Sequence, residues 1–109
     1  TEAGIGSARP GQTARDVCNA MSAVIAEMDT SGGGIGRLGH GVGLQLTEQP
    51  SLATFDVTPL AENMVLTLEP SLSYGDGLIM VHEENIVVTR AGGRLLTTRA
   101  PDELPVLHV

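Results

Sequence analysis

Three residues of the 109-residue sequence are candidate metal ligands: His40, Glu69 and Glu83. His40 lies in the glycine-rich string GHGVG, and each glutamate stands close behind a short apolar run. A carboxylate at the end of an apolar strand is costly to bury unless it is paired or bound to a cation. One imidazole with two carboxylates suits a divalent ion such as Mn²⁺, Fe²⁺, Co²⁺ or Zn²⁺. On spacing alone, surface or hydrogen-bonded side chains are the more common explanation for such residues, so both explanations stay open at this point.

Four other features have reactive groups or motif-like spacing. Cys18 has no neighbouring cysteine, which favours a structural thiol. Residues 34–39 match G-x-G-x-x-G, but a dinucleotide fingerprint follows a strand and opens a helix, whereas this string follows a predicted helix. His82 adjoins Glu83, so on a strand it points to the opposite face, which favours a structural role. His108 has no informative context and is assigned no role.

An amphipathic helix is predicted over residues 13–28, upstream of all three candidate ligands. Thr13 and Asp16 form a capping-box-like start, because their side chains are placed to satisfy free backbone N–H groups. The apolar residues recur at the three- and four-residue steps that gather side chains on one helix face. These residues are Val17, Ala20, Met21, Val24, Ile25 and Met28.

The second half of the sequence predicts strands. Residues 64–68 and 78–81 are short apolar runs bounded by turn residues, as buried strands are. Residues 86–89 and 94–97 flank a Gly-Gly pair at 92 and 93, which predicts a hairpin with its turn at these glycines. A helix followed by strands indicates an α+β fold.

Two segments predict irregular structure, and the composition argues against several classes of function. Residues 51–62 predict a loop and residues 101–109 an extended tail. A net charge of −7 with only 6 Lys and Arg argues against a nucleic-acid partner. No apolar stretch approaches the length of a membrane span, so we expect no membrane partner. One cysteine and no signal-like start lead us to expect a cytoplasmic protein.

Four blocks, in this order, resemble the pita-bread metallopeptidase family, which includes methionine aminopeptidases, Xaa-Pro aminopeptidases, prolidases and creatinase. The blocks are GHGVGL at 39–44, EQP at 48–50, NMVLTLEP at 63–70 and EENIVVT at 83–89. RPGQTA at 9–14 resembles the Pro-Gly turn before a family helix, so the resemblance spans nearly the whole chain. It implies the C-terminal portion of a pita-bread (creatinase-like) fold, a curved antiparallel sheet with helices on one face.

The resemblance also implies two divalent metal ions (Mn, Co, Fe or Zn), which the family holds with two Asp, one His and two Glu. The matching residues are His40, Glu69 and Glu83, with Glu69 and His40 as catalytic residues. Neither Asp has a counterpart, because Asp16 lies inside the predicted helix. We therefore expect residues 1–109 to be the C-terminal part of a catalytic domain that lacks the N-terminal part with both Asp ligands. We expect the 109 residues alone to be inactive.

Thr47 departs from the family pattern, because family peptidases usually place a substrate-contacting His there. A threonine hydroxyl donates a hydrogen bond but is neither a cation nor a proton shuttle near neutral pH. The leading expectation is a hydrolase of Xaa-Pro or N-terminal peptide bonds, or of a related small C–N substrate, with a homodimer as the assembly many relatives show. The alternatives are a non-peptidase enzyme of this fold, as creatinase or dimethylsulfoniopropionate lyases are, and a metal-free binding module.

Overall fold

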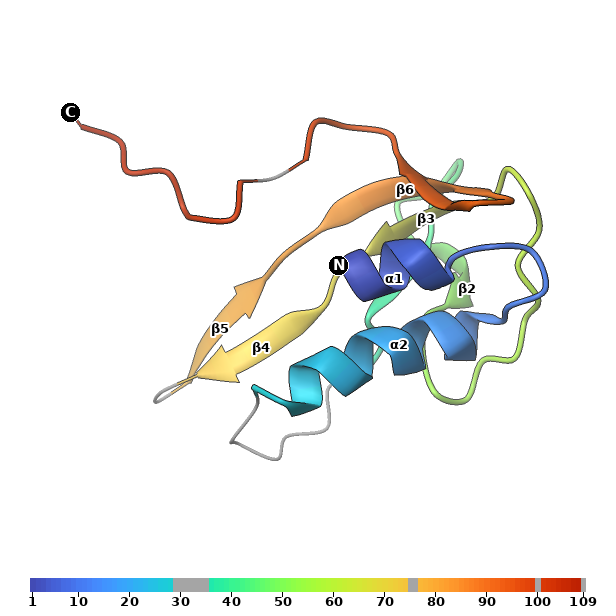
Figure 1. The fold of residues 1–109 in the computed structure, drawn as a ribbon, viewed down its shortest axis with the longest axis horizontal. Helices are drawn as coiled ribbons and strands as arrows, with labels where there is room; N and C mark the ends of the chain where they lie inside the picture. Colours follow the sequence, from blue (N-terminus) through green and yellow to red (C-terminus); the bar gives the residue numbers. More distant parts are fainter. Residues whose placement is uncertain (29–35, 75–76, 100, 109) are drawn as a thin grey trace.

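The computed structural model describes residues 1–28, 36–74, 77–99 and 101–108 (Figure 1). Within these ranges two helices precede seven strands along the chain. The elements are α1 (Glu2–Ser7), α2 (Ala14–Ala26), β1 (Gly39–Gly41), β2 (Glu48–Ser51), β3 (Val65–Leu68), β4 (Ser71–Tyr74), β5 (Leu78–Val81), β6 (Glu84–Thr89) and β7 (Gly92–Leu95).

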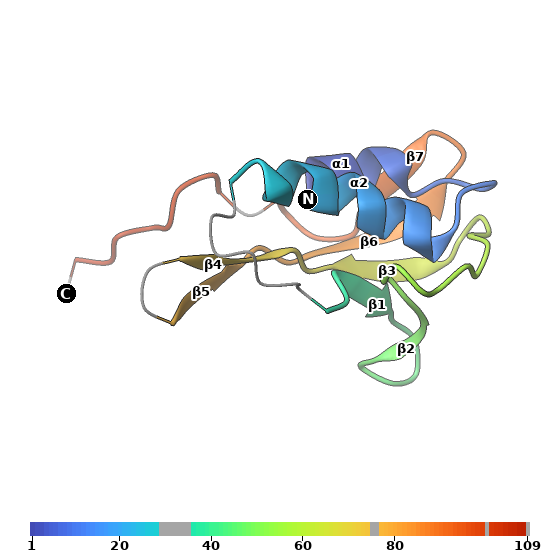
Figure 2. The same cartoon turned by 90° about the horizontal axis from the view of Figure 1, so that it is seen from below.

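The described strands form two antiparallel sheets. Five strands pair in the order β2-β1-β3-β6-β7, and β4 pairs with β5 in a hairpin that projects beyond the larger sheet (Figure 1). Both helices lie on one side of the larger sheet, and the sheet curves so that its β1–β2 edge bends away from the helices (Figure 2). The predicted α+β fold, an antiparallel sheet with helices on one face, is confirmed.

Helix α2 begins where the sequence predicts. The backbone N–H of Thr13 donates to Asp16 Oδ2 at 2.8 Å, and the backbone N–H of Asp16 donates to Thr13 Oγ1 at 3.3 Å. These two bonds form the capping box that satisfies free N–H groups of the first turn. The bond from the Thr13 backbone, followed by that from its hydroxyl, lowers the pKa of Asp16 below its ordinary value of 3.8. The helix ends at Ala26 rather than at the predicted Met28.

The core lies between α2 and the sheet. Cys18 is buried in it, as expected for a structural thiol. Helix α1 packs close to α2, because a Cβ on Gly4 would lie 2.7 Å from the sulfur of Met21. The fully buried apolar residues that link the helices to the strands are Ala14, Val17, Cys18, Met21, Leu66, Leu68, Ile86 and Val88.

The predicted strand 64–68 and the hairpin of 86–89 with 94–97 are found as β3 and β6–β7. The predicted turn of this hairpin is wrong, because Arg90 and Ala91 form it and the two glycines belong to β7. Gly92 is needed there for a different reason. Its φ is +122°, and a Cβ would lie 2.9 Å from the carbonyl oxygen of Ile5 in α1.

Strand β5 is found where residues 78–81 predict it, but its predicted burial is wrong. All four of its side chains are between 46% and 65% exposed. The hairpin pairs only with itself among the described residues, so neither of its faces is covered in the way the larger sheet is.

The loop predicted over residues 51–62 is largely confirmed, since it holds only the end of β2 and an isolated bridge between Pro59 and Thr13. Residues 101–108 contain no helix or strand and are exposed, as predicted for a tail. Of the G-x-G-x-x-G string, residues 34 and 35 lie outside the described residues. Neither α1 nor α2, the helices of the described residues, has the length and apolar character that a membrane span requires.

Candidate metal centre

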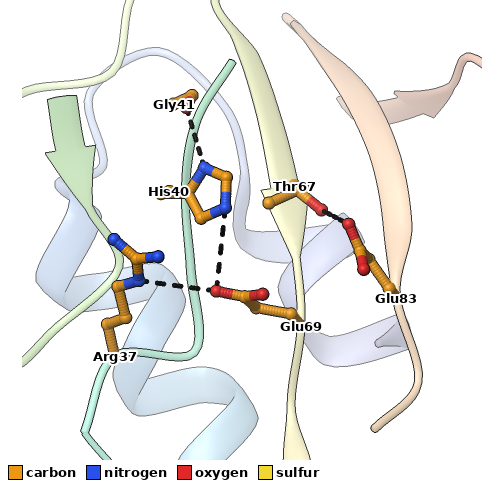
Figure 3. Close-up of polar contacts among 6 residues, drawn as sticks. All are labelled: Arg37, His40, Gly41, Thr67, Glu69 and Glu83. Carbon is orange, nitrogen blue, oxygen red and sulfur yellow. Dashed lines mark hydrogen bonds and ion pairs between the residues drawn. The ribbon is translucent and has the colours of Figure 1, made fainter. Parts of the chain in front are cut away.

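The candidate ligands lie on one face of the larger sheet, near one end of strands β1, β3 and β6. The register places His40 opposite Thr67, and Thr67 opposite Asn85. Glu69 stands two residues after Thr67, and Glu83 two residues before Asn85, so all share one face of the sheet. Backbone pairing continues beyond the strand ends, since the N–H of Glu69 donates to the carbonyl of Leu38 at 2.9 Å. The sheet therefore positions these side chains rather than a loop (Figure 3).

His40 is fixed by its own strand. Its side chain is buried, with the residue 5% exposed, and Nδ1 lies 2.8 Å from the carbonyl oxygen of Gly41. A carbonyl only accepts, so Nδ1 carries the proton and donates it in this bond. In the neutral imidazole Nε2 is then left with a lone pair, and it faces Glu69 Oε1 at 3.8 Å (Figure 3). This is the tautomer and orientation in which an imidazole binds a metal.

Glu69 lies between Arg37 and His40. Its Oε1 lies 3.5 Å from Arg37 Nε and 3.8 Å from His40 Nε2 (Figure 3). Arg37 is 40% exposed and Glu69 26% exposed, so the pair lies at the rim of the site and water screens its attraction. Arg37 therefore places a positive charge beside the Glu69 carboxylate, which faces the lone pair of His40 Nε2 on its other side.

Glu83 is held by a buried hydroxyl. Thr67 is 1% exposed, and its Oγ1 donates to Glu83 Oε1 at 2.9 Å (Figure 3). Glu83 itself is exposed. The hydrogen bond therefore fixes the direction of a carboxylate that would otherwise move freely in water.

The donor atoms fit a divalent metal by type but form an incomplete set. The lone pair of His40 Nε2 and the carboxylate of Glu69 repel each other at 3.8 Å unless a proton or a cation lies between them. Imidazole with carboxylate is a common ligand pair for transition metals. Among the described residues, however, no group of three or more His, Cys, Asp or Glu is close enough to hold one ion.

Glycines explain why β1 can carry His40. A Cβ on Gly39 would overlap the carbonyl oxygen of Thr67, and one on Gly41 would overlap that of Gln49. The φ of Gly39 is +151°. These two glycines therefore permit strands β3 and β2 to approach β1 closely.

Thr47 lies at the end of the exposed loop that joins β1 to β2. Within the described chain it makes no hydrogen bond or ion pair with His40, Glu69 or Glu83. The loop is closed by Glu48, whose Oε1 accepts from the backbone N–H of Gln45 at 2.8 Å. That Thr47 lies near a bound substrate stays a prediction.

His82 points to the other face of the sheet, as its sequence position predicts. It lies between β5 and β6 rather than within a strand, and its Nε2 is 3.4 Å from Oε1 of the buried Glu84. Glu84 pairs in register with Leu68, which packs in the core. His108 lies in the exposed tail.

Two residues that contact the candidate ligands were not predicted. Thr67 could have been found from alternation, since it stands two residues before Glu69 on an apolar strand. Arg37 gives no such signal, because it precedes a three-residue strand that the sequence does not reveal.

Known peptidases share this fold. The Xaa-Pro dipeptidase from Bacillus anthracis superimposes with a TM-score of 0.85 at 29% identity, over 97% of this chain and 30% of that one. The prolidase from Pyrococcus horikoshii OT3 superimposes with a TM-score of 0.83 at 33% identity, and the match covers 93% of this chain and 29% of the prolidase. The Xaa-Pro dipeptidase of Pyrococcus furiosus is 35% identical over 92 residues, which are 84% of this chain and 26% of the relative.

Residues 1–91 match metallopeptidase family M24. The chain belongs to this family, which confirms the resemblance drawn from the four sequence blocks. The fold expected from that resemblance, part of a pita-bread fold, is confirmed as well. The chain spans between 26% and 30% of the length of these three relatives.

Proposed function

We propose that the chain is the His- and Glu-bearing part of a dinuclear metallopeptidase that hydrolyses Xaa-Pro or N-terminal peptide bonds of small peptides. Membership of family M24 and likeness to proteins named Xaa-Pro dipeptidase support this proposal. The observation that carries it is the approach of His40 Nε2 and Glu69 Oε1, to 3.8 Å, on the face of the sheet that also presents Glu83.

His40, Glu69 and Glu83 would hold two divalent ions, with manganese as our first expectation, together with two Asp from polypeptide outside these 109 residues. When bound, the ions supply Lewis acidity and lower the pKa of a shared water toward neutrality. Glu69 would accept a proton at a carboxylate oxygen and pass it to the leaving amine. The Gly41 carbonyl would keep His40 in its ligand tautomer, and the Thr67 hydroxyl would direct Glu83.

The 109 residues alone would bind metal weakly and would not turn over a peptide. Three ligands without the two Asp leave the charge of two cations poorly balanced. The single cysteine, buried and unpaired, suits the reducing cytoplasm, where we propose that the enzyme acts.

A second candidate function is non-peptidase chemistry on a small molecule, and Thr47 favours it. A peptidase of this type needs a donor for the oxyanion that forms on the scissile carbonyl, and a cationic imidazole serves better than a hydroxyl. Because Thr47 lies in an exposed loop, a His would fit there without changing the core. Thr47→His should therefore raise peptide turnover if the enzyme is a weakened peptidase, and should leave it absent if the substrate is of another class.

The first test is metal content by elemental mass spectrometry. The protein to be measured is the longest polypeptide encoded by the reading frame that contains these residues, which we call the full product. It would be purified without added metal. We expect about two equivalents of metal, falling in His40→Ala and in Glu83→Ala. Arg90→Ala, at the exposed β6–β7 turn, is the matched control and should keep its metal.

Turnover of Xaa-Pro dipeptides then separates the candidates. Glu69→Ala should lower turnover by roughly a hundredfold or more, because the residue is both ligand and proton carrier. Full activity of Glu69→Ala would overturn both enzyme proposals. Bound metal with no turnover across a dipeptide panel would favour the non-peptidase enzyme, and a full product free of metal would favour a binding module.

A further inference from the structure

The loop that joins β1 to β2, residues 42–47, is not held in place by apolar packing. It lies at the edge of the larger sheet, where β2 is the outermost strand (Figure 2). Leu44 is 104% exposed and Leu46 is 85% exposed, so neither leucine anchors the loop to the core. A segment with so few buried contacts keeps one conformation only where hydrogen bonds fix its backbone.

Glu48 supplies such a bond from the base of the loop. It is the first residue of β2, it pairs in register with Gly41, and it is half-buried. Its Oε1 accepts from the backbone N–H of Gln45 at 2.8 Å, and the carbonyl of Gln45 accepts from the N–H of Gly43 at 3.3 Å. A carboxylate is a stronger acceptor than a neutral group. The side chain of Glu48 therefore reaches back over the loop and fixes it near its middle.

Gly43 leaves room for this carboxylate. A Cβ on Gly43 would overlap Oε2 of Glu48 and would lie 2.9 Å from its Cδ. The carboxylate thus stands where a side chain at position 43 would begin, and a larger residue there would displace it. Gly43 and Glu48 are therefore matched to each other across the loop.

The loop connects a candidate metal ligand to the residue that departs from the family pattern. Gly41 precedes the loop, and its carbonyl accepts from His40 Nδ1. Thr47 is the last residue of the loop and adjoins Glu48. Because the strand that carries His40 fixes one end of the loop, the conformation of the loop decides where Thr47 stands relative to a group bound at His40.

We infer that Glu48 is a positioning residue, whose carboxylate keeps the loop in one conformation and so sets the place of Thr47 beside a bound substrate. Glu48 itself contacts neither metal nor substrate. The inference rests on the proposed function for the substrate, whereas the bond from Gln45 to Glu48 belongs to the 109 residues themselves.

The first test is the order of the loop in the 109-residue chain, measured by ¹⁵N relaxation of its backbone amides. We expect order parameters of about 0.8 at residues 43–47, falling below about 0.6 in Glu48→Ala. Glu48→Gln keeps an acceptor oxygen in the same place and should stay rigid. Gly43→Ala keeps the carboxylate but displaces it, so the loop should loosen as it does in Glu48→Ala. Glu62→Ala removes one negative charge from an exposed ion pair and is the matched control.

The second test is peptide turnover by the full product. If Thr47 contacts the reacting group, kcat for Xaa-Pro dipeptides should fall roughly tenfold in Glu48→Ala and in Gly43→Ala, and by less than about threefold in Glu48→Gln. Metal content and KM should stay near those of the unsubstituted protein, because the metal ligands are untouched. A general loss of folded protein would lower the metal content as well, and Glu48→Gln would not rescue a purely electrostatic effect.

A loop that stays rigid in Glu48→Ala would overturn the inference. An equal loss of kcat in Glu48→Gln and Glu48→Ala would overturn it as well, because the acceptor oxygen would then not matter. A full product that turns over no peptide would instead refute the proposed peptidase, and the relaxation measurement would still decide whether Glu48 fixes the loop.

Discussion

Replacing Thr67 by Val tests whether one buried hydroxyl organises the metal face. Thr67 is 1% exposed, and its Oγ1 donates to Glu83 Oε1 at 2.9 Å. Valine has nearly the same shape, so the substitution removes the donor while leaving strand β3 packed. The exposed carboxylate of Glu83 then loses its protein donor and turns to water.

The expected effect on folding is small, and the effect on metal binding is large. Losing one hydrogen bond costs about 0.5–1.5 kcal/mol, and the added buried methyl group returns about 0.8 kcal/mol. The free energy of unfolding should therefore change by less than ~1 kcal/mol. A ligand whose orienting partner is removed typically loses about 10- to 100-fold in metal affinity, or roughly 1.4–2.7 kcal/mol. Loss of the Thr67 hydroxyl should thus change the metal affinity much more than the free energy of unfolding.

The assay is Mn²⁺ affinity of the full product by competition with a chelator, alongside urea unfolding of the 109-residue chain. Thr67→Ser is the matched control, because it keeps the hydroxyl and loses only a methyl group. We expect Thr67→Ser to retain metal affinity within a few-fold of the original protein. If Thr67→Val binds Mn²⁺ as tightly as the original protein while unfolding normally, the hydroxyl does not orient Glu83 and the reasoning is refuted.

Three further predictions concern the 109-residue chain and are measured by urea unfolding. Thr13→Ala removes a capping-box acceptor and should lower the unfolding free energy by about 1 kcal/mol. The pKa of Asp16 is lowered on folding, so ionised Asp16 stabilises the fold above pH 3.8, and this stabilisation is lost as the pH falls through the pKa of the folded state. In Asp16→Asn the free energy of unfolding should therefore fall less steeply at acid pH, and an unchanged pH dependence would show that Asp16 is not the group responsible. Gly41→Ala should destabilise by about 1–3 kcal/mol, because its Cβ meets the Gln49 carbonyl, whereas Gly6→Ala meets nothing within 4 Å and should cost nothing.

Helix α2 and strands β3 and β6 could be predicted because their signals are local. The apolar spacing of α2 and its capping pair are both readable within a few residues, and each produces the structure that it predicts. Likewise, the apolar run at 64–68 predicts a strand, and Leu66 and Leu68 of that strand pack against the helices. Where the intrinsic preference of a segment agrees with its tertiary packing, the local sequence is sufficient to predict its secondary structure.

Strand β1 could not be predicted because its residues suit a strand only in its tertiary context. Glycine has a low preference for strands, so the string around His40 predicts a loop. Its glycines are required because β2 and β3 approach from both sides, and a Cβ would overlap the carbonyls of Gln49 and Thr67. That requirement comes from residues distant in sequence. The same gap hid Arg37, whose nearness to Glu69 depends on where β1 lies.

The error at β5 has a different cause. Its four apolar residues predict a strand covered on both faces, and the strand formed while the covering did not. Periodicity reports what a segment buries in its complete context, whereas exposure reports what is present in these 109 residues. The apolar pattern of β5 therefore predicts a strand correctly, but it does not predict how much of that strand the described residues cover.

Alternation along β6 allows one strand to serve both the core and the candidate site. Ile86 and Val88 point into the core beside α2, and the buried Glu84 shares their face. Glu83 and Asn85 point to the opposite face, where Thr67 holds the carboxylate. A shift of one residue between β3 and β6 would turn Glu83 toward the helices and Ile86 toward the metal face. The hydrophobic core thus fixes the register, and the register places the ligands. The candidate metal face therefore depends on the packing of α2, even though α2 contributes no ligand to it.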